Sequence, residues 1–182
     1  LFRSKSKIIN GDFTINQRAF TTTTTTATYT FDRWLTSLSD GTVTYSTQAF
    51  TPGAAPVAGY EATNFIRIVT SGQTLSSARS VIQQRIEDVR TLAGQTATVS
   101  FWAKAATGTP FVATTFQQIF GSGGSTTVNL TGQKTAITTS WARYSFTFSV
   151  PSISGATIGT GSYIQARIFT SGGSDEATQN AS

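Results

Sequence analysis

Two stretches of the sequence decide the fold: Leu92-Ala-Gly-Gln-Thr-Ala-Thr-Val-Ser-Phe-Trp-Ala-Lys104 and Ser140-Trp-Ala-Arg-Tyr-Ser-Phe-Thr-Phe-Ser-Val-Pro151. Apolar and polar residues alternate one by one in both, which is the pattern of a strand with one buried face. The second stretch ends at Pro151, because proline has no amide hydrogen to donate to a strand ladder. Each stretch is therefore predicted to be a strand, with Phe101 and Phe146 turned toward a core.

Further strands are expected on both sides of this pair. Alternating or β-branched runs occupy residues 43–50, 65–69, 111–120 and 163–169, and shorter runs occupy 128–130 and 134–138. Residues 80–90 fit helical spacing as well as strand spacing, and because their neighbours are strands we predict a strand ending near residue 87. Residues 8–13 are expected to form a short strand and turn, and the threonines at 21–26 an exposed loop. Roughly nine strands without a helix predict an all-β sandwich of two antiparallel sheets.

The length of 182 residues suits one domain. We expect residues 1–7 to be a linker, 8–170 the β-sandwich, and 171–182 a polar linker or the start of a following segment. No stretch approaches the ~20 apolar residues of a membrane-spanning helix, so membrane insertion is not expected. The 13 Lys and Arg outnumber the 8 Asp and Glu. These cations are scattered, which argues against nucleic-acid binding and is compatible with attraction to an acidic glycan.

The sequence contains no His and no Cys. Serine–histidine and cysteine–histidine catalysis and the usual zinc sites are therefore excluded. A glycosidase needs two facing carboxylates, and Asp32 with Glu87 is the least implausible pair. The alternative is that Asp32 pairs with Arg33 or caps a turn, and that Glu87 pairs with Arg85 or Arg90. We predict that the chain is not an enzyme and requires no cofactor.

Calcium is the one metal ion whose binding the sequence leaves open. Calcium binds several oxygen atoms that converge from loops, and the candidates are Asn10, Asp12 and Asp175. No contiguous Asp-x-Asp loop supports them. The alternative is that Asn10-Gly-Asp12 is simply a turn.

A face for sugar binding is suggested by one tryptophan and several amides. Strand alternation places Trp102 and Lys104 opposite Phe101, toward solvent. Sugars stack their apolar C–H patches on exposed aromatic rings and are ringed by amides and charged groups. The polar residues predicted to surround the sugar are Gln84, Gln117, Gln118, Gln165 and Arg167. The alternative is that Trp102 packs under a loop or against another subunit.

Residues Leu92–Ala105 and Thr139–Phe148 resemble strands of carbohydrate-binding modules in the cluster of families 4, 9 and 22, and Asn10–Phe13 resembles the first strand of those modules. A closer resemblance is to a variant of this module in bacteriophage and prophage virion proteins. It is carried by three motifs in order: Asn10-Gly-Asp-Phe-Thr-Ile-Asn-Gln-Arg18, Tyr29-Thr-Phe-Asp-Arg-Trp34 and Gln84-Arg-Ile-Glu-Asp88. The resemblance covers most of residues 8–170.

This resemblance implies a jelly-roll sandwich that serves as a non-enzymatic module on a virion surface, in a tail fibre, a tail-associated protein or a head-fibre or decoration protein. It also implies an extracellular homo-oligomer among other virion subunits that attaches to host-surface carbohydrate, and Arg85 of the third motif joins the residues predicted to contact sugar. One alternative is a structural decoration or connector whose Trp102 and Phe116 contact sister subunits. Another is a carbohydrate-binding appendage of a bacterial glycoside hydrolase. The motif residues themselves are alternatively a buried polar network that fixes the strands.

Overall fold

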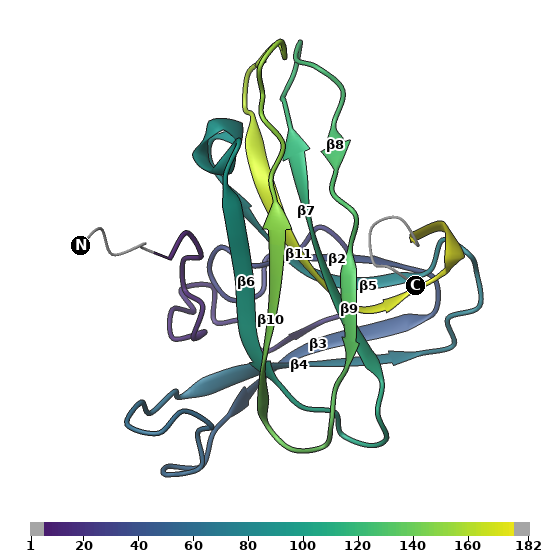
Figure 1. Cartoon of the computed structure of the whole chain (residues 1–182). Coiled ribbons are helices and arrows are strands. Elements are labelled where there is room, and N and C mark those ends of the chain that lie inside the picture. The colour runs from purple at the N-terminus through teal and green to yellow at the C-terminus, as the bar shows by residue number, and fades with distance from the viewer. Residues whose placement is uncertain (1–5, 177–182) are drawn as a thin grey trace.

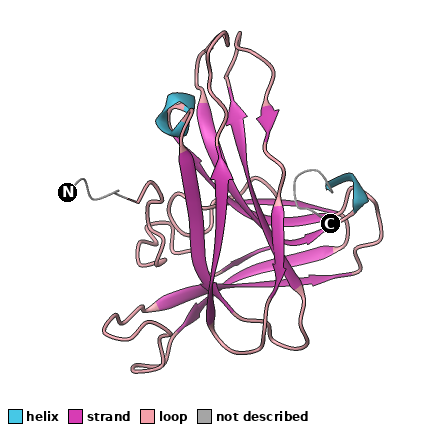
Figure 2. Cartoon of the chain, in the orientation of Figure 1, coloured by secondary structure: helices cyan, strands magenta, loops and turns pink. Residues whose placement is uncertain are grey.

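A computed structural model describes residues 6–176, which form strands and two short 3-10 helices (Figures 1 and 2). The strands of this part of the chain are β1 (Thr22–Thr23), β2 (Leu35–Ser39), β3 (Thr42–Ala49), β4 (Asn64–Ser71), β5 (Arg79–Ile86), β6 (Thr96–Ala103), β7 (Phe111–Ile119), β8 (Val128–Asn129), β9 (Gln133–Ala136), β10 (Ala142–Ser149) and β11 (Tyr163–Gly172). The helices are η1 (Val89–Leu92) and η2 (Ser174–Glu176). The predicted all-β class is confirmed.

The largest sheet has six strands in the order β2-β5-β11-β7-β8, and β9 also pairs with β7. Two smaller sheets have the orders β10-β6 and β1-β3-β4. Every ladder between these strands is antiparallel. The last strand among residues 6–176, β11, lies between β5 and β7 in the middle of the six-stranded sheet.

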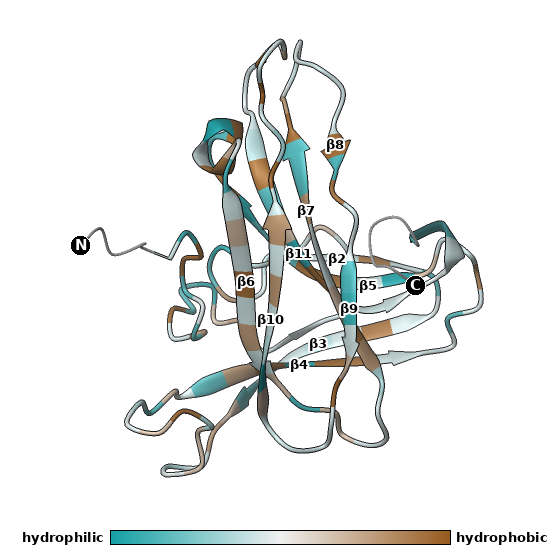
Figure 3. Ribbon diagram, in the orientation of Figure 1, coloured by the Kyte–Doolittle hydropathy of each residue, from teal (hydrophilic) through white to brown (hydrophobic). Residues whose placement is uncertain are grey.

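Alternation along β6 and β10 turns one side of each strand to the core, as predicted (Figure 3). On β10, Phe146 and Phe148 are buried, and Thr147 between them is exposed. These two rings pack in one cluster with Phe116 of β7 and Ile164 of β11. The β6–β10 pair therefore covers one part of the inner face of the six-stranded sheet.

The sheet that contains β3 and β4 covers the other part of that inner face. Val43 and Tyr45 of β3 cluster with Ile82 of β5 and with Phe31 and Trp34 from the segment before β2. The Tyr45 hydroxyl donates to the carbonyl of Val81 at 2.9 Å, and burial raises its pKa. The six-stranded sheet is thus one layer and the two small sheets form the other (Figure 1), which is the two-layer arrangement of a jelly-roll sandwich.

Departures from the sequence predictions lie in loops and at one core residue. The ambiguous segment forms a strand and not a helix, as predicted, and this strand, β5, ends at Ile86. The strand predicted at residues 8–13 is wrong, because that segment is a turn in which Phe13 N donates to Asn10 O at 3.3 Å. The threonine run is mostly exposed, but Thr22–Thr23 pairs with β3. Phe116 is buried in the core, so the idea that it contacts a sister subunit is wrong.

No helix among residues 6–176 is both long enough and apolar enough to cross a membrane.

Candidate functional site

The outer face of the six-stranded sheet is the side turned away from β6 and β10. On β11, Ile164 and Ala166 point into the core, so Gln165 and Arg167 point outward. Residues paired across neighbouring strands point to the same side of a sheet. The register places Arg85 of β5 and Gln117 of β7 on either side of Gln165. Four residues predicted to contact sugar therefore share this face: Arg85, Gln117, Gln165 and Arg167.

A hydrogen-bonded chain of side-chain amides, here called the amide row, crosses this face through Gln83, Gln165, Gln117 and Asn129. Gln165 Nε2 donates to Gln83 Oε1 at 2.8 Å and to Gln117 Oε1 at 3.3 Å. Gln117 Nε2 donates to Asn129 Oδ1 at 2.6 Å. Within the described residues, Gln83 Nε2 and Gln165 Oε1 make no hydrogen bond. The row therefore holds its amides in fixed orientations, and the donor group Gln83 Nε2 and the acceptor Gln165 Oε1 remain for a ligand.

A hollow of about 240 Å³ lies at one end of the outer face, next to the amide row. Its lining residues come from loops as well as strands: Tyr29, Arg33, Leu35, Arg85, Glu87, Gly161, Ser162 and Tyr163. Exposure rises toward this end, since Gln165 exposes 6% of its surface and Tyr29 exposes 43%. The hollow is therefore the place where the outer face opens to solvent.

An arginine guanidinium group lies over each of two tyrosine rings at the hollow. Arg85 Cζ lies 4.7 Å from the ring centroid of Tyr163, and Arg18 Cζ lies 5.0 Å from that of Tyr29. Both distances are those of cation–π contacts. The hollow thus combines aromatic surface with charged donors, which is the combination that polar ligands with apolar patches require.

Arg33 reaches the hollow from the turn before β2. Its Nη2 lies 3.0 Å from Glu87 Oε1 and 3.5 Å from the carbonyl oxygen of Arg85. The backbone of Arg33 has φ 75°, a left-handed conformation that costs a residue with a side chain about 1–2 kcal/mol. Backbone strain of this kind clusters at ligand sites, so Arg33 is a further residue of the candidate site.

Arg167 lies beyond the amide row, on the side away from the hollow. Its guanidinium Cζ lies 4.6 Å from the ring centroid of Phe169. Burial lowers the pKa of Arg167 to about 10, and the nearby charge of Glu176 opposes that shift. Glu176 itself pairs with Arg79 at 3.2 Å. Arg167 therefore belongs to a charged cluster where η2 meets the sheet.

Gln84 is a structural residue. It points to the inner face, where Ile9 N donates to Gln84 Oε1 at 2.7 Å and Gln84 Nε2 donates to Ile9 O at 2.9 Å. It exposes 1% of its surface, so the prediction that it contacts sugar is wrong. Gln118 is likewise buried, with Nε2 donating to the carbonyl of Pro151 at 3.0 Å. The third motif therefore contributes Arg85, and not Gln84, to the outer face.

The other two motifs fix the N-terminal segment to the sandwich. Trp34 Nε1 donates to Asn10 O at 2.8 Å, and Asn10 Nδ2 donates to Asp32 O at 3.0 Å. Asp32 in turn accepts from Gln17 N at 2.6 Å and pairs with Arg18 at 2.8 Å. These contacts form a polar network that is exposed or partly buried and that fixes the N-terminal segment, whereas the alternative explanation of the motifs was a buried network that fixes the strands. The carboxylate of Asp32 is thus paired with Arg18 and not with Arg33, and Glu87 pairs with Arg33.

Trp102 and Lys104 lie on the opposite layer of the sandwich. Trp102 points outward from β6, as predicted, and is 39% exposed. Lys104 Nζ lies 5.5 Å from the ring centroid of Trp141, which packs against Phe50 and Phe65. The structure therefore does not bring Trp102 and Lys104 together with the amide row. The residues that were predicted to surround one sugar lie on two opposite faces of the sandwich.

The three calcium candidates are also separated. Asp12 Oδ2 accepts a hydrogen bond from the hydroxyl of Tyr60, which lowers the pKa of Asp12. Asp175 accepts from Ser76 Oγ at 2.8 Å and lies in η2, on the other side of the molecule from the N-terminal segment (Figure 1). Among residues 6–176, no group of three or more Asp and Glu side chains is placed to hold a metal ion. The predicted set of Asn10, Asp12 and Asp175 therefore does not assemble.

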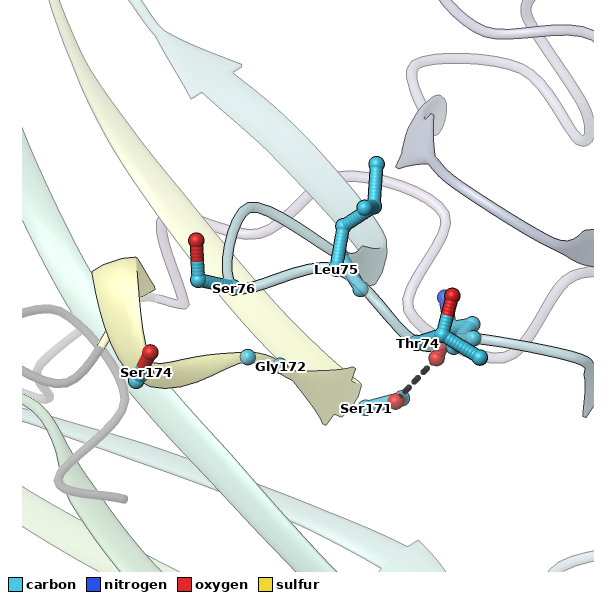
Figure 4. A pocket seen from close by; sticks show the side chains of 9 residues that line it. Thr74, Leu75, Ser76, Ser171, Gly172 and Ser174 are labelled. Atoms are coloured by element: carbon cyan, nitrogen blue, oxygen red, sulfur yellow. Dashed lines mark hydrogen bonds between the residues drawn. The ribbon is translucent and has the colours of Figure 1, made fainter.

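A second hollow, of about 430 Å³, lies where the loop before β5 meets the end of β11 (Figure 4). Hydroxyl groups of Thr74, Ser76, Ser171 and Ser174 surround it, and Ser171 Oγ donates to Gln73 Oε1. No aromatic or charged side chain lines it. It lacks the rings and cations of the first hollow, which is the better candidate for a ligand site.

Comparison with known proteins adds a family. The family model CBM_4_9, described as "Carbohydrate binding domain", matches residues 28–160. No curated protein matches the sequence.

Similar solved structures include the enzymatically active domain of tailspike protein 4 from bacteriophage CBA120, at 17% identity and a TM-score of 0.47, covering 78% of this chain and 18% of that chain. They also include the CBM22-2 xylan-binding domain of Xyn10C from Paenibacillus barcinonensis, at 13% identity and a TM-score of 0.47, covering 81% of this chain and 83% of that chain. This chain thus spans 18% of the length of the tailspike chain that it matches.

Proposed function

This chain belongs to the CBM_4_9 family of carbohydrate binding domains, and we propose that it is a non-catalytic module that binds a glycan of the bacterial cell surface. The proposed site is the hollow at Arg85, with the amide row beside it on the outer face of the six-stranded sheet. Trp102 and Lys104 on the other layer lie outside this site.

The observation that carries the proposal is the continuity between the amide row and the hollow. Arg85 lines the hollow and is paired in register with Gln165 of the row. A sugar chain presents hydroxyl groups at regular intervals, and neutral amides bind hydroxyls as both donors and acceptors. The rings of Tyr29 and Tyr163 supply the apolar surface for the C–H patches of one sugar unit.

We place the module on the outside of a bacteriophage virion, as part of a tail fibre, a tail-associated protein or a head decoration. The support is the ordered set of three motifs that resembles phage virion proteins. In that setting it is a homo-oligomer bound to other virion subunits, and repeated weak sugar contacts add up through multivalency. The proposal involves no nucleic acid, no membrane insertion and no cofactor.

Family membership equally favours a second function, a carbohydrate-binding appendage of a bacterial glycoside hydrolase. The two functions predict different neighbours along the complete chain. A hydrolase domain next to this one supports the appendage, and a fibre shaft or virion-anchoring domain supports the phage role.

A glycan array tests the binding proposal, with the protein displayed on a multivalent carrier to amplify weak contacts. We expect at least one bacterial-surface oligosaccharide to bind. Arg85→Ala and Gln165→Ala should each weaken that binding about tenfold or more, because each removes a hydrogen-bonding group from the site. Trp102→Ala is the matched control on the opposite layer and should leave binding unchanged.

Two results would contradict this assignment. Loss of binding in Trp102→Ala with retention in Arg85→Ala would move the site to the outer side of β6. If the folded, multivalent protein binds no glycan on the array, the remaining function is that of a structural decoration or connector.

A further inference from the structure

The charges around the hollow do not cancel. Its charged lining residues are Arg33, Arg85 and Glu87. Glu87 is paired with Arg33 at 3.0 Å, whereas Arg85 has no carboxylate partner among the described residues. One guanidinium charge is therefore left uncompensated at the wall of the hollow.

The carboxylates next in sequence to the lining residues Glu87 and Arg33 are engaged elsewhere. Asp88 accepts from Ser162 Oγ at 3.1 Å but pairs with Arg90 at 2.5 Å. Asp32, in the motif that also carries Tyr29, pairs with Arg18 at 2.8 Å. Neither is paired with Arg85, so an anion on the ligand is what remains to compensate it.

The contact between Arg85 and Tyr163 prepares the guanidinium for such an anion. The contact of Arg85 Cζ with the Tyr163 ring, at 4.7 Å from the centroid, restrains the guanidinium and uses none of its N–H groups. Two parallel N–H groups match the two oxygens of a carboxylate or sulfate in a bidentate contact. Glu87 is the carboxylate closest in sequence to Arg85 at this site, but it is paired with Arg33, and its side chain is 71% exposed, so solvent screens its repulsion of a bound anion.

We propose that the sugar unit in this hollow is acidic and that its carboxylate or sulfate group binds the guanidinium of Arg85, with Arg33 as a second cation. The inference rests on the proposed function, since it names the class of glycan for the same site. At about 240 Å³ the hollow is smaller than a drug-sized site of roughly 300–1,000 Å³, which suits one sugar unit. The net charge of +5 attracts an acidic glycan from a distance.

The test is an array that carries each acidic oligosaccharide beside a neutral counterpart of the same backbone. Methyl esters serve as counterparts for carboxylate sugars, and desulfated forms serve for sulfated sugars. We expect the acidic member of a pair to bind about tenfold or more tightly, since a hydrogen bond to a charged group is worth more than a neutral one. A difference in affinity within the carboxylate pairs identifies the anion as a carboxylate, and a difference within the sulfated pairs identifies it as a sulfate.

Three variants assign the effect to the hollow. Arg85→Gln should reduce binding of the acidic member about tenfold and remove most of the difference within the pair. Glu87→Gln should strengthen binding of the acidic member, because it deletes a competing carboxylate. Arg67→Gln is the charge-matched control, since Arg67 is an exposed residue of β4 on the other layer, and it should change binding less than twofold.

Arg85→Lys guards against an effect of misfolding, because it keeps the charge and loses the planar fork. It should bind the acidic probe with an affinity between those of the unaltered protein and Arg85→Gln. Equal binding of acidic and neutral partners, or an equal loss in Arg67→Gln, overturns the inference and leaves the proposed function standing. Binding to no glycan of either kind overturns both.

Discussion

Gln84 holds both backbone polar groups of Ile9, accepting from its N–H at 2.7 Å and donating to its carbonyl at 2.9 Å. A side-chain amide thus pairs with the N-terminal segment as a neighbouring strand would, although that segment forms no strand. Trp34 adds a third bond, to the carbonyl of Asn10. The segment is therefore fixed to the sandwich by side chains of the second and third motifs.

Replacing Gln84 should release this segment. Gln84→Leu keeps the volume of the side chain but leaves the N–H and carbonyl of Ile9 without partners, so we expect a loss of about 1–3 kcal/mol in the free energy of unfolding. Urea denaturation followed by tryptophan fluorescence measures it. Gln48→Leu on β3, whose amide bonds only to Ser46, is the control. A loss no larger than in that control would contradict the role of Gln84.

Arg33→Gly separates ligand binding from stability. Glycine adopts φ 75° without strain, while the lost Arg33–Glu87 pair is an exposed one worth at most about 1 kcal/mol. We therefore expect a melting temperature equal to or above that of the unaltered protein and weaker glycan binding. Thermal unfolding and binding to an acidic glycan are measured on one preparation. A large fall in melting temperature would show that Arg33 is mainly structural.

The hydrogen bonds to Asp40 predict that the fold loses stability in acid. Leu75 N and Thr74 N donate to Asp40 Oδ2 at 2.8 and 2.6 Å, and these bonds lower the pKa of Asp40 below its ordinary value of 3.8. A lowered carboxyl pKa stabilises the fold above that ordinary value, and the contribution disappears as the pH falls through the folded-state pKa. Asp40→Asn, which tolerates φ 61° at this position, should therefore lose less stability than the unaltered protein between about pH 4 and pH 2. Parallel losses in urea titrations across that range would refute this.

Removal of divalent cations should change nothing. Asn10 and Asp12 lie on one side of the molecule and Asp175 on the other, and each is already hydrogen-bonded to protein groups. We expect equal melting temperatures in millimolar EDTA and in millimolar calcium. A calcium-dependent rise of several degrees would reveal an ion site that these residues do not explain.

Strand positions could be predicted from the sequence because residue alternation records burial directly. Phe146 and Phe148 alternate with polar residues, and the structure buries the two rings and exposes their polar neighbours along the strand. The N-terminal third was harder to predict. Its shape depends on contacts such as Trp34 to Asn10, which join residues far apart in the sequence, and on left-handed residues such as Arg33 and Asp40.

The candidate site was predictable only where it lies on strands. Gln165 and Gln117 follow from alternation, and the same rule applied to β5 would have placed Gln84 inward with Ile82 and Ile86 and left Gln83 on the outer face. Tyr29 and Arg33 line the hollow from loops. No periodicity marks loop residues, so their meeting with Arg85 is visible only in three dimensions.

The central place of β11 has a consequence for synthesis on the ribosome. As the last strand of the sandwich, β11 must insert between β5 and β7, which are made much earlier. Until residue 172 has emerged, both partners carry open edges, and open edges pair readily with other chains. The sandwich can therefore close only after β11 has been made, and a nascent chain that stalls before residue 163 is prone to aggregate.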